Sequence, residues 1–141
     1  MVSAKKAYEL IILDFLPPPS RCIISQIWNF NIPQKLKCFT WLDFFNKINT
    51  WDKLCNRGWL GPNRCFLCKK EVESIDHLFV GCSFALEVMH FFDSFIDIHM
   101  DCSEPTLTGN LISWFEKDRK LSYLPIFFIW NLWKTRNNHI F

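Results

Sequence analysis

Three cysteines and one histidine follow one another in a C-x2-C-x8-H-x4-C pattern, formed by Cys65, Cys68, His77 and Cys82. Two thiols separated by two residues can hold one metal ion in a tight turn. An imidazole and a third thiol then complete a tetrahedral shell of the donors that Zn²⁺ prefers. Because four protein ligands leave no open position, the spacing predicts one structural zinc ion rather than a catalytic one.

The alternative for these four residues is a set of buried thiols and an ordinary histidine. Gly81 and the basic residues beside the pattern favour the metal. The patterns of catalytic zinc sites are absent, because no H-x-E element precedes a P-C-x-x-C pair and no H-E-x-x-H occurs. A Cys/His nucleophile pair built on Cys55 has no local support, so no enzyme is predicted.

The composition predicts one folded domain inside the cell. The chain has 141 residues, half of them hydrophobic and 17% aromatic, whereas disordered chains are poor in aromatic residues. No apolar run reaches the roughly 18 residues of a membrane helix, and acidic residues and prolines interrupt any signal peptide. We therefore expect a nuclear or cytoplasmic protein. The odd number of cysteines argues against a disulfide framework, and four are expected to be small core residues: Cys22, Cys38, Cys55 and Cys102.

The charge is unevenly distributed along the chain. Between Gln34 and Lys70 there are eight basic residues against two acidic ones, and from Glu71 onward ten acidic residues against five basic ones. A basic half predicts a polyanion partner, RNA or DNA, while an unevenly charged solvated surface remains the alternative. Trp51 and Trp59 stand among these basic residues and could stack on bases, although burial in the core is the more common fate of tryptophan. The candidate nucleic-acid-binding residues are Lys35, Lys37, Lys53, Arg57, Arg64, Lys69 and Lys70.

The elements that must position these residues are predicted to be helices. Apolar spacing and capping residues indicate helices over residues 3–13, 33–46, 51–57, 84–96, 106–117 and 124–140. Residues 17–19 are three prolines and are expected to form a stiff spacer, and 23–30 could be helical or extended. The fold class is therefore mainly α, a compact multi-helix domain with a small zinc knuckle or hairpin. We divide it into an N-terminal helix and spacer (1–20), a zinc-binding domain (21–100) and a C-terminal helical extension that packs on it (101–141).

The path from His77 to Cys82 needs a break in the helix. Ser74 is a good N-cap for the turn that contains His77. Five residues separate His77 from Cys82, about 500° of α-helical rotation, so the two would not share a face of an unbroken helix. Gly81 is expected to provide the bend.

The order of these features resembles a known family. Four segments are similar to the zinc-binding domain that follows the reverse transcriptase in plant non-LTR (LINE-type) retrotransposons. They are Trp28, IPQKLKCFTWL at 32–42, TWDKL at 50–54, and ESIDHLF at 73–79 before Cys82. The segment IWNLWKTRNNHIF at 129–141 resembles the stretch that joins this domain to a ribonuclease H domain. The segment SAKKAY at 3–8 resembles one that lies upstream of the zinc-binding domain in the family. Gln34 stands where the family usually has lysine.

The resemblance implies a non-catalytic module. It would bind one zinc and hold template RNA or target DNA for neighbouring reverse transcriptase and ribonuclease H domains, whose catalytic carboxylate clusters this chain lacks. Two alternatives stay open. One is a protein-interaction or scaffold domain that docks through an exposed patch of Trp130, Trp133 and Phe141. The other is a retroelement remnant that folds around zinc without a selected role.

Overall fold

The computed structural model describes residue 3 and residues 6–7, 18–96, 100–117 and 123–140. Within these residues the chain forms helices and no strand, so the mainly α fold is confirmed. No described helix is both long and apolar enough to cross a membrane. The elements in chain order are α2 (Pro18–Asn29), α3 (Gln34–Phe44), α4 (Trp51–Asn56), the π-helical turn η1 (His77–Gly81), α5 (Ser83–Ile96), α6 (Leu107–Lys117) and α7 (Leu124–Ile140).

The prolines near the N-terminus begin a helix, and the prediction of a spacer was wrong for two of them. α2 starts at Pro18, so the second and third prolines lie in its first turn. Proline is tolerated there because the amides of a first helical turn have no partner within the helix. Residues 23–29, which the sequence left undecided, belong to this same helix. The predicted helix over 3–13 lies almost entirely outside the described residues.

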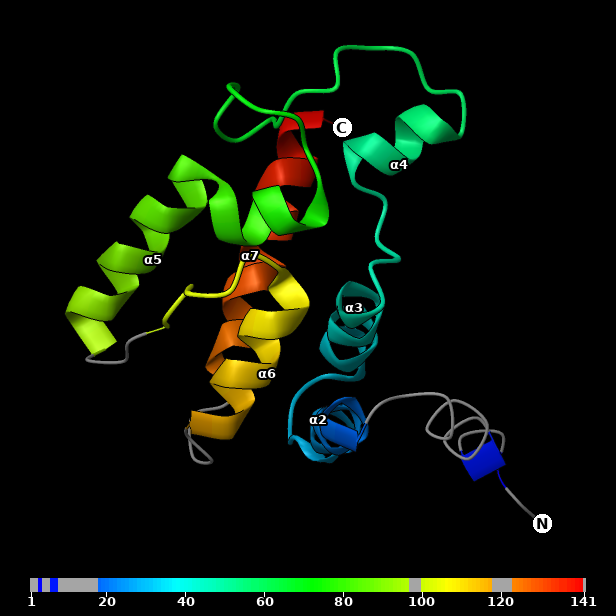
Figure 1. The fold of residues 1–141 in the computed structure, drawn as a ribbon, viewed down its shortest axis with the longest axis vertical. Coiled ribbons are helices and arrows are strands. Elements are labelled where there is room, and N and C mark those ends of the chain that lie inside the picture. Colours follow the sequence, from blue (N-terminus) through cyan, green and yellow to red (C-terminus); the bar gives the residue numbers. More distant parts are fainter. Residues whose placement is uncertain (1–2, 4–5, 8–17, 97–99, 118–122, 141) are drawn as a thin grey trace.

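The apolar body of the domain, called the helical end below, is formed by helices α2, α3, α6 and α7. The metal-binding end, with α4 and the metal-binding loops, lies opposite (Figure 1). α2 packs against α3 and α6, α3 packs against α6 and α7, and η1 packs against α5. The Phe39 ring joins the two ends of the domain. Its centroid is 6.4 Å from that of Phe79 in η1 and 5.0 Å from that of Trp130 in α7. The turn that contains His77 therefore rests on the helical core.

Two of the four cysteines expected in the core are exposed. Cys22 and Cys38 lie on the solvent sides of α2 and α3, while Cys55 and Cys102 are half-buried. The larger side chains of each helix decide which side packs inward, for example Ile27 in α2 and Leu36 in α3. Cysteine is too small to override that preference, so the prediction was wrong for Cys22 and Cys38.

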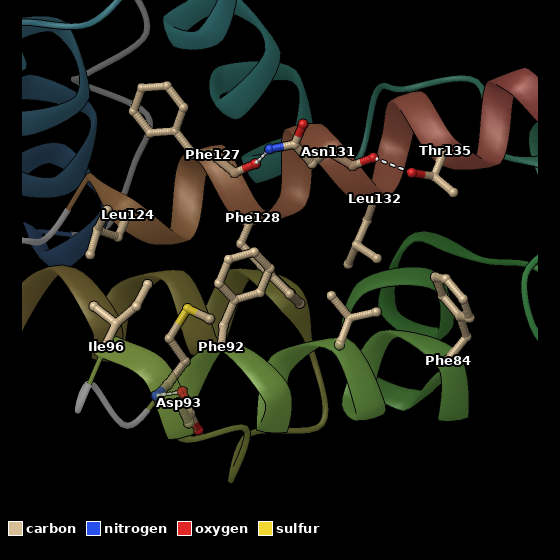
Figure 2. A pocket seen from close by; sticks show the side chains of 12 residues that line it. Phe84, Phe92, Asp93, Ile96, Leu124, Phe127, Phe128, Asn131, Leu132 and Thr135 are labelled. Atoms are coloured by element: carbon tan, nitrogen blue, oxygen red, sulfur yellow. Dashed lines mark hydrogen bonds between the residues drawn. The ribbon is translucent and has the colours of Figure 1, made fainter.

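Helix α5 leaves much of its apolar surface uncovered. The side chains of Phe92 and Phe95 are 43% and 73% exposed, whereas Met89 is buried. Between α5 and α7 runs a cleft of about 210 Å³ with a mostly apolar lining, to which Phe84, Phe92 and Leu132 contribute (Figure 2). α5 is apolar on more sides than its neighbours cover, so the sequence pattern could not show which aromatic residues stay outside.

Candidate metal centre

The four predicted donor residues converge on one point. One ligand atom from each of Cys65, Cys68, His77 and Cys82 lies within 4.8 Å of all the others. The Sγ atoms of Cys65 and Cys82 are 3.8 Å apart, and Cys68 Sγ lies 3.3 Å from His77 Nε2. A tetrahedral zinc ion with Zn–S bonds of about 2.3 Å places two sulfurs roughly 3.8 Å apart. The donor set and its spacing therefore fit one zinc ion.

The first two cysteines lie in a closed turn. The Cys65 amide donates to the Glu71 carbonyl at 2.7 Å, and the Lys69 amide donates to the Cys65 carbonyl at 2.8 Å. Lys69 has a φ of +58°, in the left-handed region that reverses the chain. The expected small hairpin is thus a knuckle closed by backbone hydrogen bonds, with no strand among the described residues.

The π-helical turn η1 brings His77 and Cys82 to the same point. The His77 amide donates to Ser74 Oγ at 3.1 Å, so Ser74 caps this turn as the sequence indicated. The predicted bend at Gly81 was wrong, because Gly81 remains in η1 and the chain becomes extended at Cys82 (φ −71°, ψ 125°). A π-helix bonds residue i to i+5 and is wider than an α-helix. Residues five apart therefore come nearly into line, and no glycine bend is needed.

Backbone amides surround two of the sulfurs. The amides of Leu67 and Cys68 donate to Cys65 Sγ, and those of Phe84 and Ala85, at the start of α5, donate to Cys82 Sγ. Such bonds favour thiolates, the form that binds metal.

Without metal the two sulfurs interact through one proton. The hydrogen bond with Cys82 raises the pKa of Cys65, and the same bond lowers the pKa of Cys82. The shared hydrogen bond therefore favours the thiolate of Cys82 over that of Cys65. A divalent ion would take the place of the remaining proton.

Glu71 orients the histidine. Its Oε2 lies 3.4 Å from His77 Nδ1, while Nε2 faces Cys68. A proton held on Nδ1 leaves the lone pair of Nε2 free for the metal, which is how carboxylates commonly support histidine ligands. No spacing pattern in the sequence marks Glu71 as a partner of His77.

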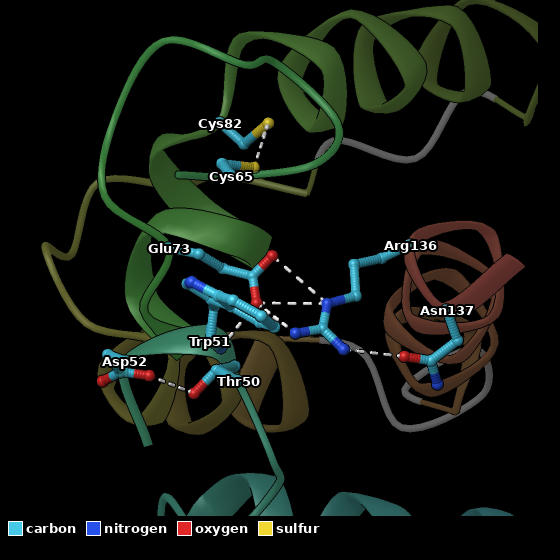
Figure 3. Close-up of polar contacts among 8 residues, drawn as sticks. All are labelled: Thr50, Trp51, Asp52, Cys65, Glu73, Cys82, Arg136 and Asn137. Atoms are coloured by element: carbon cyan, nitrogen blue, oxygen red, sulfur yellow. Dashed lines mark hydrogen bonds and ion pairs between the residues drawn. The ribbon is translucent and has the colours of Figure 1, made fainter. Parts of the chain in front are cut away.

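A buried ion pair links the metal loops to the last helix (Figure 3). Glu73 and Arg136 are 0% and 1% exposed. Arg136 Nε donates to the two carboxylate oxygens of Glu73 at 3.1 and 3.2 Å, and Nη2 also donates to Oε1. Glu73 Oε1 further accepts the Trp51 amide at 2.7 Å. One carboxylate therefore joins the metal loop, the first turn of α4 and α7.

Sequence reasoning missed this pair, although a signal for it exists. Arg136 follows the buried Ile129 and Leu132 at seven and four residues, on the same side of α7. A charged residue on a buried helical face needs a partner of opposite charge. The sequence does not show that the partner is Glu73.

Four of the predicted nucleic-acid-binding residues contact other groups of the protein. Lys37 Nζ donates to a carbonyl of α2 at 2.9 Å, and Lys53 Nζ donates to the Asn46 carbonyl. Arg57 Nη1 donates to a side-chain amide oxygen at 2.7 Å, and Lys35 Nζ lies 5.7 Å from the centre of the Trp130 ring. Part of the basic half therefore supports the fold.

The other three predicted residues surround the metal knuckle. Arg64, Lys69 and Lys70 are exposed, and no ion pair or side-chain hydrogen bond joins them to any described residue. The structure thus brings three unpaired cations next to the four donor residues.

Comparison with known proteins supports the zinc assignment. A family model described as zinc-binding in reverse transcriptase matches residues 3–88, more than half of the chain. A protein of Arabidopsis thaliana named "Putative ribonuclease H protein" is 30% identical over 81 residues, which are 57% of this chain and 13% of that protein. The chain thus corresponds to a small part of this relative. No solved structure matches the chain. The segment that the family model matches, residues 3–88, contains the four donor residues and Glu73, whereas Arg136 lies beyond it.

Proposed function

This chain belongs to the family of zinc-binding domains of reverse transcriptases, and from that membership we propose that it is a non-catalytic module that binds RNA or DNA for a neighbouring polymerase. In this proposal Cys65, Cys68, His77 and Cys82 bind one zinc ion. The observation that supports it most is the location of the unpaired cations Arg64, Lys69 and Lys70 on and beside the knuckle.

The metal has a structural role in this proposal. Three thiolates, one imidazole and Zn²⁺ form a closed shell that cross-links the knuckle to η1. Such a shell offers no position for the activated water of zinc hydrolases. The knuckle, once cross-linked, fixes the positions of the cations Arg64, Lys69 and Lys70. These side chains neutralise phosphates but do not distinguish one base from another.

Binding to single-stranded RNA at several salt concentrations tests this function. We expect micromolar or tighter affinity. The logarithm of the binding constant should fall linearly with the logarithm of the salt concentration, because each neutralised phosphate releases a counterion. The triple substitution of Arg64, Lys69 and Lys70 by glutamine should reduce both the affinity and its salt dependence. Absence of binding by the zinc-loaded protein at low salt would contradict the proposal.

The uncovered aromatic face of α5 favours a second candidate function, docking of another protein domain. Phe91 and Phe95 are exposed, with ring centroids 4.7 Å apart. Other residues of the same helix, among them Phe92, line the cleft against α7 (Figure 2). The patch expected on the C-terminal helix does not support docking as well, because Trp130 and Trp133 are half-buried against Phe39. Phe141 lies outside the described residues.

The two candidates can be separated. Serine at Phe91 and Phe95 should leave nucleic-acid affinity unchanged. If α5 is a docking face, the same changes should weaken binding to a reverse transcriptase or ribonuclease H domain.

A further inference from the structure

The loop after α4 presents apolar side chains to solvent. Trp59 is 53% exposed and Leu60 is 95% exposed, whereas the other six tryptophans are buried or half-buried. No ring contact or side-chain hydrogen bond joins Trp59 to the described residues. An exposed tryptophan among cations commonly marks a binding surface.

This loop is held in one conformation by its own contacts. The Trp59 amide donates to the Leu54 carbonyl at 3.1 Å. Gly61 has a φ of +154° and lies against the Trp51 ring so closely that a Cβ atom there would be 2.7 Å from Trp51 Cζ2. A side chain at position 61 would displace the loop. The exposure of Trp59 is therefore a property of the folded loop.

The loop lies next to the metal knuckle. Trp51, on which Gly61 rests, also packs edge-on against Phe66 between the first two cysteines, with ring centroids 5.6 Å apart. Arg57 and Arg64 flank Trp59 along the chain, and Lys69 and Lys70 follow Phe66 in the knuckle. Two acidic residues lie nearby in the sequence, and both have partners: Asp52 accepts a hydrogen bond from Thr50 Oγ1, and Glu71 faces His77. Trp59 thus belongs to a surface with an excess of positive charge.

We infer that Trp59 stacks on an unpaired base and that the zinc end of the domain binds single-stranded nucleic acid in preference to duplex. The inference rests on the function proposed above. Cations alone attract any polyanion, but a projecting indole gains most from a free base face, since paired bases are already stacked on their neighbours. Leu60 can cover the edge of the same base.

Binding to three strands of equal length tests the inference. The probes are a single-stranded oligothymidylate of about 12 nucleotides, its duplex form, and an abasic strand with the same phosphates. We expect the zinc-loaded protein to prefer the base-bearing single strand. Trp59→Ala should weaken that binding roughly tenfold, in the range of one lost base–aromatic contact, and leave binding of the abasic strand unchanged. Trp59→Phe should restore most of the loss.

Two control variants separate stacking from general effects. Phe91→Ala removes an exposed aromatic ring on α5, and Lys117→Ala removes an exposed cation at the end of α6 that is distant from α4 (Figure 1). Neither should change the preference for the single strand.

The possible results have distinct meanings. Equal loss for base-bearing and abasic strands on Trp59→Ala, or equal affinity for duplex and single strand, would overturn the inference while leaving nucleic-acid binding intact. No binding of any strand would overturn the proposed function itself. Loss of binding to anionic lipid vesicles on Trp59→Ala, without loss of binding to the oligothymidylate, would make the loop a membrane contact and would also overturn the inference.

Discussion

Among the described residues, the metal-binding end and the helical end of this domain each bury one carboxylate, and the surroundings of the two differ. Glu73 accepts hydrogen bonds from Arg136 and from the Trp51 amide. Asp43, 1% exposed on α3, has no hydrogen-bond partner for either oxygen within the described part of the chain. The metal end thus depends on directional polar bonds. Apolar packing holds the helical end, and such packing tolerates a poorly placed polar group.

The two carboxylates also differ in how they avoid a buried unpaired charge. Arg136 compensates the charge of Glu73. Burial raises the pKa of Asp43 well above its ordinary value of 3.8 and thereby favours its neutral, protonated form. A buried carboxyl that is neutralised by a proton lowers the stability of the folded protein. A carboxylate whose charge is balanced by a well-placed partner need not do so.

Removal of the metal should have the largest effect, and should be concentrated at the metal end. With Cys68→Ser or a chelator, we expect metal content to fall from one ion per chain to near zero. We also expect the free energy of unfolding to fall by on the order of several kcal/mol, because ligand binding and folding of such sites are coupled. Mass spectrometry measures the metal, and hydrogen exchange compares residues 65–82 with α3 and α6.

Cys38→Ser is the matched control, since Cys38 is exposed and distant in sequence from the donor residues. It should change neither metal content nor exchange. If residues 65–82 kept their protection after complete removal of the metal, the metal end would not depend on zinc.

Removal of the charge of Glu73 should have the next largest effect. Glu73→Gln leaves the Arg136 guanidinium buried without its counter-charge, and we expect a loss of about 3–5 kcal/mol in the free energy of unfolding. Denaturant unfolding measures it, with the exposed Glu87→Gln in α5 as control. Replacement of both partners, as in Glu73→Leu with Arg136→Met, should recover much of the loss. A loss no larger than that of Glu87→Gln would show that the two buried carboxylates do not differ as described.

Asp43 should respond in the opposite direction. Asp43→Leu removes an unpaired buried carboxyl, and we expect a gain of about 1–3 kcal/mol at neutral pH. Because the folded pKa is raised, the folded protein binds more protons than the unfolded chain at pH values between 3.8 and the folded pKa. Stability from this group is therefore present below about pH 4 and decreases as the pH rises through that window.

The pH dependence provides the check. Unfolding at several pH values should show this decrease in the parent protein and a smaller one in Asp43→Leu. Asp101→Asn, at an exposed aspartate, should keep the parent slope. Loss of stability in Asp43→Leu at neutral pH would indicate that Asp43 has a partner.

The elements that the sequence predicted depend on local chemistry. The bounds of α7 follow from Pro125 in its first turn and from the apolar spacing after it, and the Ser74 cap and the cluster of four donors follow from short spacings. The Glu73–Arg136 pair joins residues 63 apart, so no local pattern contains it. The exposure of Phe95 depends on what the neighbouring helices fail to cover. Sequence patterns identify an apolar face but not its partner.

The smallest predicted effect concerns backbone strain, which also differs between the two ends. Two residues other than glycine have positive φ among those described: Asn46 at +53°, after α3, and Lys69 at +58°, in the knuckle. Asparagine tolerates this region, whereas lysine pays a steric penalty there. We expect Lys69→Asn to raise the free energy of unfolding by about 0.5–1 kcal/mol and Asn46→Lys to lower it by a similar amount.

Thermal unfolding of the zinc-loaded protein measures both, with Lys70→Asn as the matched loss of charge. If Lys69→Asn and Lys70→Asn had the same effect, charge rather than backbone conformation would explain the change. The knuckle would then store no more strain than the end of α3.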